Sequence, residues 1–264
     1  MAPAYTHGHH PSVLSAHRWR TVDNSAAYLA GHLRPGMSVL DVGCGPGTIT
    51  AGLAERVAPG RVVAADAAET VLDEARANTA GLDNVEFAVA DVHALDFPDG
   101  TFDVVHAHQV LQHVADPVGA LREMRRVTRP GGIVAARDVD FGTVVWYPEP
   151  PEMAPWVPIY YAVARGNGGE PDAGRRLVSW ARSAGFTDVT ASSSSWCFST
   201  PEEREWWSES WGGRMVASSV AEHAVEGGHA TREELQRIYE GWKAWAAADD
   251  GWFSLTHGEI ICRA

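Results

Sequence analysis

The stretch Val39-Leu40-Asp41-Val42-Gly43-Cys44-Gly45-Pro46-Gly47-Thr48 reads as a short apolar strand that breaks into a glycine-rich turn and then opens a helix. Glycine carries no Cβ, so Gly43, Gly45 and Gly47 can adopt positive φ and present bare N–H groups beside the positive end of that helix. We therefore expect a ligand to lie close to the backbone at this turn.

The sequence around the turn alternates β-rich runs with helical periodicity, which is typical of βαβ units and a parallel sheet. Strands are predicted at 37–42, 61–65, 85–89, 102–108 and 132–139. Beyond them we expect a helix at 172–184, a strand starting at Phe186, helices starting near Thr200 and Thr231, and a last strand at 252–262 with Ile260 and Ile261 buried. The predicted fold class is α/β.

Composition narrows the possible partners. The chain has 264 residues, 45% of them apolar, and a net charge of −13, which repels phosphate backbones and anionic lipid headgroups. Nucleic acid and membrane are therefore not expected as partners. Its three cysteines are far apart and no apolar run approaches the length of a membrane span, so we expect no disulfide framework, no metal site and a cytoplasmic location.

The glycine turn departs from the dinucleotide fingerprint G-x-G-x-x-G, because Thr48 stands where the third glycine would be. Three carboxylates accompany the turn. Asp41 precedes it, Asp66 ends the second strand, where it can accept both hydroxyls of a ribose, and Asp91 follows the third strand, where it can accept an adenine amine. This acidic set favours a cationic ligand over a pyrophosphate.

Five segments together resemble the class I S-adenosylmethionine-dependent methyltransferases. They are Val39-Leu-Asp-Val-Gly-Cys-Gly-Pro-Gly47, Val63-Ala-Ala-Asp66, Ala90-Asp-Val92, Phe102-Asp-Val-Val-His-Ala-His108 and Leu121-Arg-Glu-Met-Arg-Arg-Val-Thr-Arg-Pro-Gly-Gly132. In detail, the sequence around these segments is similar to that of the small-molecule branch, which includes the ubiquinone- and menaquinone-biosynthesis type of enzyme. The resemblance implies a Rossmann-like, mostly parallel seven-stranded sheet with helices on both faces, its last strand antiparallel, and here with helical cap insertions.

The resemblance also implies a site and a division of the chain. S-adenosylmethionine, with S-adenosylhomocysteine as product, would be bound by Asp41, Gly43, Cys44, Gly45, Asp66, Ala67, Asp91, Val92, His108 and Gln109. The predicted parts are N-terminal lid helices (1–36), the cofactor-binding core (37–140), a cap insertion (141–171), a core helix and strand (172–198), a helical insertion (199–250) and the final core strand (251–264).

Two places are candidates for catalytic residues. His113 lies just past Gln109 at the carboxyl edge of the sheet and could act as a base, or it could cap or pack the local helix. The segment from Tyr5 to His17 is rich in histidine. It could form a lid in which Tyr5 or the histidines close over the methionyl group, it could form a metal site, or it could be a frayed terminus.

Eleven tryptophans, most of them after residue 140, are many for this length. They could be ordinary packing, or they could line a pocket for a planar acceptor. The leading hypothesis is a methyltransferase acting on O or C, and possibly N, of a small, largely apolar or aromatic metabolite. The alternatives are a non-catalytic protein that keeps the cofactor fold and an NAD(P)-dependent oxidoreductase.

Overall fold

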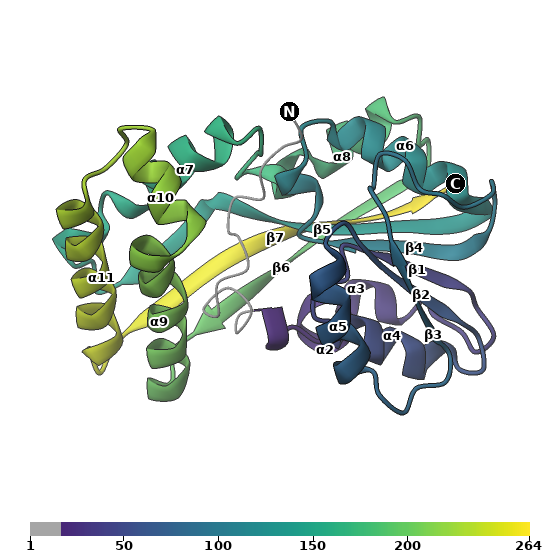
Figure 1. The fold of residues 1–264 in the computed structure, drawn as a ribbon, viewed down its shortest axis with the longest axis horizontal. Helices are drawn as coiled ribbons and strands as arrows, with labels where there is room; N and C mark the ends of the chain where they lie inside the picture. Colours follow the sequence, from purple (N-terminus) through teal and green to yellow (C-terminus); the bar gives the residue numbers. More distant parts are fainter. Residues whose placement is uncertain (1–16) are drawn as a thin grey trace. The chain divides into compact units, whose positions relative to one another are not determined.

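The computed structural model describes residues 17–264, which build one seven-stranded sheet in the order β3-β2-β1-β4-β5-β7-β6 (Figure 1). The strands are β1 (Val39–Val42), β2 (Val62–Asp66), β3 (Val85–Val89), β4 (Phe102–His108), β5 (Thr128–Tyr147), β6 (Val189–Phe198) and β7 (Trp252–Arg263). Pairs β1/β2, β1/β4, β2/β3 and β4/β5 are parallel.

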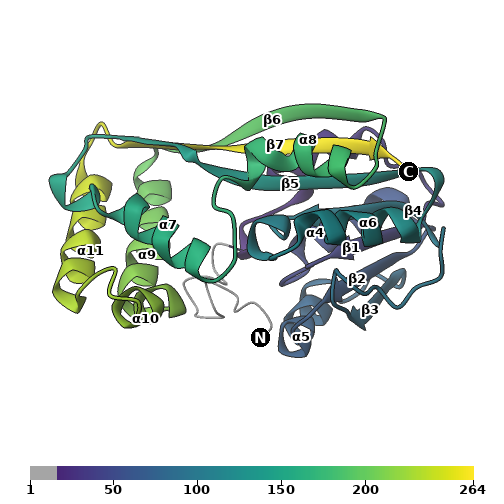
Figure 2. The same cartoon turned by 90° about the horizontal axis from the view of Figure 1, so that it is seen from above.

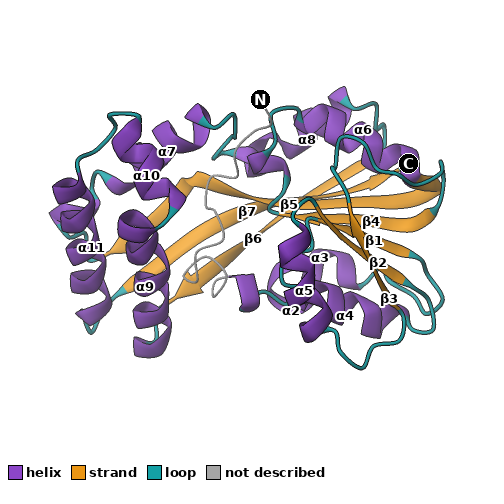
Figure 3. Ribbon diagram, in the orientation of Figure 1, coloured by secondary structure: helices purple, strands orange, loops and turns teal. Residues whose placement is uncertain are grey.

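Strand β7 runs against its neighbours, as its arrow in Figure 3 shows. Gly131 N donates to Ala264 O near the start of β5, and Arg137, further along β5, contacts Glu259, which lies earlier in β7. The sheet is therefore mixed and mostly parallel, and the predicted fold class is confirmed.

The helices are α2 (Val22–Ser25), α3 (Ala27–Ala30), α4 (Thr48–Val57), α5 (Glu69–Asn78), α6 (Pro117–Val127), α7 (Trp156–Gly166), α8 (Ala173–Ser183), α9 (Pro201–Ala217), α10 (Ser219–Glu226) and α11 (Arg232–Ala247), with 3-10 turns η1 (Leu111–His113) and η2 (Pro151–Met153). Helices α9 and α11 begin where the sequence indicates, because Thr200 and Thr231 each form a capping box with a glutamate three residues later.

The described residues form two compact units, which we call the core unit (17–139, 173–194 and 257–264) and the aromatic unit (140–172 and 195–256). In the core unit, helices α6 and α8 lie on one face of the sheet and α2 to α5 on the other (Figure 1). Leu40 and Ile260 face the first apolar layer, whereas Val39 and Ile261 face the second. Ile260 is buried as predicted, but Ile261 is only partly buried.

The aromatic unit contains the part of β5 from residue 140 onward, the end of β6 from residue 195 and the part of β7 up to residue 256. Its helices α7, α9, α10 and α11 lie on one side of these strands in Figure 2. Aromatic rings make up a large part of its core: the Trp156 ring lies 4.8 Å from that of Trp242 and 5.0 Å from that of Trp211, with T-shaped geometry in both pairs. These rings pack on one another, so burial of aromatic surface contributes to the stability of this unit.

Candidate active site

The glycine turn after β1 has the conformation that its sequence predicts. Gly43, Gly45 and Gly47 have φ of +66°, +54° and +78°, which side chains with a Cβ rarely adopt. A Cβ on Gly43 would lie 2.4 Å from Val110 Cγ2, and one on Gly47 would lie 2.9 Å from Ala75 Cβ. A Cβ on Gly45 would meet nothing within 4 Å. Gly43 and Gly47 are therefore needed for packing, whereas the space at Gly45 is open to a ligand.

Two carboxylates brace the turn. Asp66, at the end of β2, accepts hydrogen bonds from Gly45 N at 3.1 Å and from Ala68 N at 3.0 Å. Asp41 is buried on β1, where it accepts from Thr50 Oγ1 at 2.6 Å and lies 2.8 Å from His106 Nδ1. Asp41 thus ties β1 to α4 and β4, and Asp66 ties β2 to the turn.

The other predicted residues of the cofactor site lie around this edge. Cys44 is buried, and burial raises the pKa of its thiol, so the thiol stays neutral. Ala67 is exposed just past Asp66, and Val92 is buried. Asp91 is exposed and accepts from His93 N at 2.9 Å, a bond that lowers the pKa of its carboxyl. The described contacts join Asp66 directly to the turn but do not join Asp91 to it.

The end of β4 holds a group of buried imidazoles. The rings of His108 and His257 stack with centroids 6.3 Å apart, and burial lowers the pKa of both well below the usual value. Gln109 has a φ of +54°, and its Nε2 lies 2.8 Å from His257 Nε2. A non-glycine residue in this region stores strain, which is common at functional sites. Both imidazoles are therefore neutral, and the nearby cations Arg137 and Arg20 also lower their pKa.

Hydrogen bonds of the Gln112 backbone and side chain link η1 to β5. Asp138 is buried and accepts from Gln112 N at 3.0 Å, while Gln112 Oε1 accepts from Val139 N at 3.2 Å. Gln112 Nε2 lies 2.9 Å from His113 Nε2. Asp138 Oδ2 is buried and has no hydrogen-bond partner within residues 17–264. Burial raises the pKa of the Asp138 carboxyl to about 7.

A buried ion pair completes the polar end of the core unit. Arg137 Nε donates to Glu259 Oε1 at 3.2 Å, and Glu259 also accepts from Ser192 Oγ at 2.7 Å and from Ser194 Oγ at 2.5 Å. Burial lowers the pKa of Arg137 to about 10. The pair joins β5, β7 and β6 at the level of His108, which is in register with Arg137.

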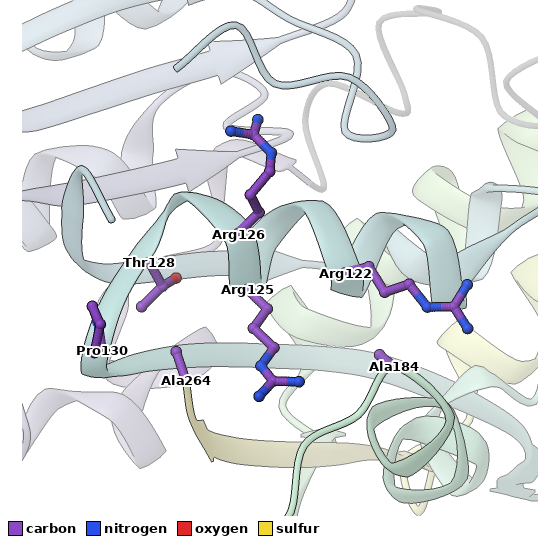
Figure 4. A pocket seen from close by; sticks show the side chains of 7 residues that line it. All are labelled: Arg122, Arg125, Arg126, Thr128, Pro130, Ala184 and Ala264. Atoms are coloured by element: carbon purple, nitrogen blue, oxygen red, sulfur yellow. The ribbon is translucent and has the colours of Figure 1, made fainter. Parts of the chain in front are cut away.

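A pocket of about 500 Å³ in the core unit lies at the opposite, amino end of β5, next to Pro130 (Figure 4). Its arginines are held by the protein itself: Arg122 donates to Ser183 O, Arg125 donates to Gly185 O and Arg126 pairs with Glu123. These bonds assign the arginines a structural role in tying α6 to its surroundings.

Some predicted features concern other parts of the chain. Tyr5 and the first histidines lie outside the described residues. Within residues 17–264 no group of three His, Cys, Asp or Glu side chains is arranged to hold a metal ion. None of the described helices is long and apolar enough to cross a membrane.

The sheet order with an antiparallel β7, the glycine turn after β1 and the carboxylate at the end of β2 define the class I S-adenosylmethionine-dependent methyltransferase fold. Comparison with known proteins agrees. A family model described as a methyltransferase domain matches residues 33–167. An uncharacterized methyltransferase of Schizosaccharomyces pombe is 34% identical over 270 residues, covering 97% of this chain and 95% of that protein. The chain therefore belongs to the S-adenosylmethionine-dependent methyltransferase family.

Two further matches are more limited. Demethylmenaquinone methyltransferase of Staphylococcus aureus is 37% identical over 113 residues, covering 42% of this chain and 47% of that protein. The solved structure of Haemonchus contortus phosphoethanolamine N-methyltransferase 2, in complex with S-adenosylhomocysteine, has a TM-score of 0.54 at 20% identity and covers 88% of this chain and 49% of that one. The first is a partial match to the quinone-type branch, and the second is a likeness of fold.

Five residues of the polar edge were not predicted: Gln112, Arg137, Asp138, His257 and Glu259. A signal existed for four of them. Arg137 and Asp138 are adjacent charged residues inside a run predicted as a buried strand, and charges at such positions are costly unless they are paired or functional. His257 and Glu259 carry a similar signal, because they continue the buried phase that Phe253 and Leu255 begin in strand β7, where alternation predicts apolar residues.

Proposed function

We propose that this methyltransferase acts on an oxygen or carbon, with nitrogen as the less favoured atom, of a small, largely apolar or aromatic metabolite. The observation that carries this proposal is the aromatic unit, whose core contains four buried indole N–H groups, those of Trp146, Trp156, Trp207 and Trp242, without a hydrogen-bond acceptor in the described chain. Each such donor costs about 1–3 kcal/mol when unpaired, and a polar atom of a bound metabolite would relieve that cost.

The residues of the glycine turn fit the cofactor. The absent Cβ at Gly45 leaves open space beside a backbone N–H that Asp66 already orients, and Asp66 supplies a carboxylate suited to ribose hydroxyls. We assign contacts with the cofactor to Asp41, Gly43, Cys44, Gly45, Asp66, Ala67, Asp91, Val92, His108 and Gln109. S-adenosylmethionine, when bound, supplies an electrophilic methyl group on a sulfonium.

The chain's own contribution is to orient the acceptor and exclude water. In-line methyl transfer depends on holding the nucleophile at attack distance, and a base is needed only when the acceptor must lose a proton. The neutral His108 and His257 suit a cationic donor, because further positive charge beside a sulfonium would weaken its binding. We also propose that Tyr5 and His113 act near the reacting groups.

A panel of acceptors tests the proposal. The protein is incubated with S-adenosylmethionine and 1-naphthol, catechol, 1,4-naphthoquinol, indole or an acidic β-diketone, and S-adenosylhomocysteine and the mass of the product are measured. We expect a gain of one methyl group on a hydroxylated or acidic-carbon compound. Methylation of protein or RNA, with none of the small molecules modified, would contradict the proposed substrate class.

A further inference from the structure

Asp91 receives two hydrogen bonds from one neighbour, and both end on the same carboxylate oxygen. His93 N donates to Asp91 Oδ1 at 2.9 Å, and His93 Nδ1 lies 2.9 Å from the same atom. These bonds lower the pKa of the Asp91 carboxyl, so the carboxyl is ionised at neutral pH. Because the oxygen of an ionised carboxyl only accepts hydrogen bonds, His93 Nδ1 carries the proton in this contact.

The second oxygen of the same carboxylate is left for a donor from outside the chain. Asp91 Oδ2 takes no hydrogen bond from residues 17–264, and the Asp91 side chain is 67% exposed. Each carboxylate oxygen has room for about two donors, so the backbone N–H and the ring N–H of His93 fill Oδ1. A donor on a bound molecule would therefore meet Oδ2.

The backbone on both sides of Asp91 is held in place. Ala90 N donates to Asp66 O at 3.0 Å, which joins the end of β3 to the end of β2. Val92 is buried in the first apolar layer of the core unit. Rotation of the Asp91 side chain is then the main freedom left at this position, and the bond to the His93 ring restricts it.

We propose that His93 is a positioning residue that keeps Asp91 Oδ2 free and oriented for the exocyclic amine of the adenine, and that the site thereby favours a 6-amino purine over a 6-oxo purine. This inference rests on the proposed function, which assigns Asp91 to the cofactor. A 6-amino group donates hydrogen bonds, whereas a 6-oxo group only accepts them. The 6-oxo group would face another acceptor at Oδ2, and a site built for a donor rejects such a ligand.

Calorimetry with two product nucleosides tests this inference. They are S-adenosylhomocysteine and S-inosylhomocysteine, in which a 6-oxo group replaces the 6-amino group. The measured quantity is the ratio of their Kd values, because a loss of stability or an added charge weakens the binding of both nucleosides alike. We expect the wild-type chain to bind S-adenosylhomocysteine at least about tenfold more tightly, a difference of about 1.4 kcal/mol.

Asparagine and aspartate at position 93 give a matched pair of variants. Asparagine Nδ2 is attached to Cγ, as Nδ1 of histidine is, so H93N keeps a donor near Asp91 Oδ1, and its ratio should stay within about twofold of the wild-type ratio. H93D places a charged acceptor there, which repels the Asp91 carboxylate, so its ratio should fall about fivefold or more. The control is H32D, which adds the same charge at an exposed position of the core unit and should leave the ratio unchanged.

The outcomes separate this inference from the proposed function. Binding of S-adenosylhomocysteine with an unchanged ratio in H93D, or with a wild-type ratio below about threefold, would overturn the role of His93 and leave the cofactor assignment intact. A ratio that falls equally in H93N and H93D would also overturn it, because the donor at position 93 would then not matter. If the wild-type chain binds neither nucleoside, the proposed cofactor site fails, and the role of His93 fails with it.

Discussion

Asp138 makes the stability of the protein depend on pH in a direction opposite to that of most carboxylates. Its pKa rises from 3.8 to about 7 because the side chain is buried, and the hydrogen bonds from η1 and two nearby arginines only partly oppose this rise. A carboxyl whose pKa is raised on folding destabilises the folded state when it ionises. This destabilisation is absent below about pH 4, grows as the pH rises and is complete above about pH 7.

The size of this change in unfolding free energy follows from the linkage between proton binding and folding. A shift of about three pKa units corresponds to about 4 kcal/mol in total, of which about 3 kcal/mol develops between pH 5 and pH 8. The charged groups that act on Asp138 are Arg137 on the same strand and Arg20 from the N-terminal side, and both lower its pKa. Tyr28, whose buried hydroxyl is also sensitive to Asp138, stays protonated because burial raises its pKa.

The perturbation is D138N. Asparagine keeps an oxygen that can accept from Gln112 N but places an NH₂ where Oδ2 is buried, at a cost of about 1–3 kcal/mol that does not depend on pH. We expect D138N to be less stable than the wild type at pH 5 and more stable at pH 8, with the difference in unfolding free energy changing by about 3 kcal/mol.

Urea denaturation at pH 5, 6, 7 and 8 measures this difference. The control is D83N, at an exposed position, which should show a flat difference across the same range. A D138N difference that stays constant within about 0.5 kcal/mol would refute the claim that Asp138 is buried with a raised pKa.

Three other predictions follow from single contacts. G45A should weaken S-adenosylmethionine binding more than tenfold. Gly81 is another glycine with positive φ and open space, so G81A should lose similar stability and still bind S-adenosylmethionine. Equal losses of binding affinity in calorimetry would contradict this. E259Q should cost about 3–5 kcal/mol in denaturant unfolding, because Arg137 then lies buried without its counter-charge, and a cost below about 1 kcal/mol would show the pair to be unimportant. W242A should cost about 3–5 kcal/mol, since Trp242 is fully buried against Trp156, and an unchanged thermal midpoint would contradict that packing.

The sequence predicted the core unit well because its signals are local. The first two parallel strands are short apolar runs that end at a glycine or an aspartate, and Val39 to Val42 and Val62 to Asp66 lie within two residues of their predicted bounds. The capping boxes at Thr200 and Thr231 likewise fix helix starts through residues three apart.

The errors have physical reasons too. Strand β5 continues to Tyr147, beyond its predicted end at 139. The aromatic run after this point suggested a cap insertion, but Thr143, Val144 and Val145 are β-branched and favour a strand. Helix α10 was missed, since its eight residues contain two alanines and two valines without a long periodic stripe.

The polar edge could not be predicted in full because its contacts join residues far apart in the chain. Gln109 meets His257 across 148 positions, and Arg137 meets Glu259 across 122. The periodicity of a strand shows which face a side chain takes, but not which partner it finds there. The tryptophans illustrate the same limit: their abundance was evident, and their packing on one another emerged only from the fold.

We propose that the glycine turn with Asp66 binds a cationic methyl donor. Calorimetric titration of the wild-type chain with S-adenosylmethionine measures this binding, with NADH titrated in parallel. We expect saturable one-to-one binding of S-adenosylmethionine with a Kd between about 1 μM and 1 mM, the usual range for enzyme substrates, and no binding of NADH. Absence of saturable heat from S-adenosylmethionine at several millimolar, or tighter binding of NADH, would contradict the account.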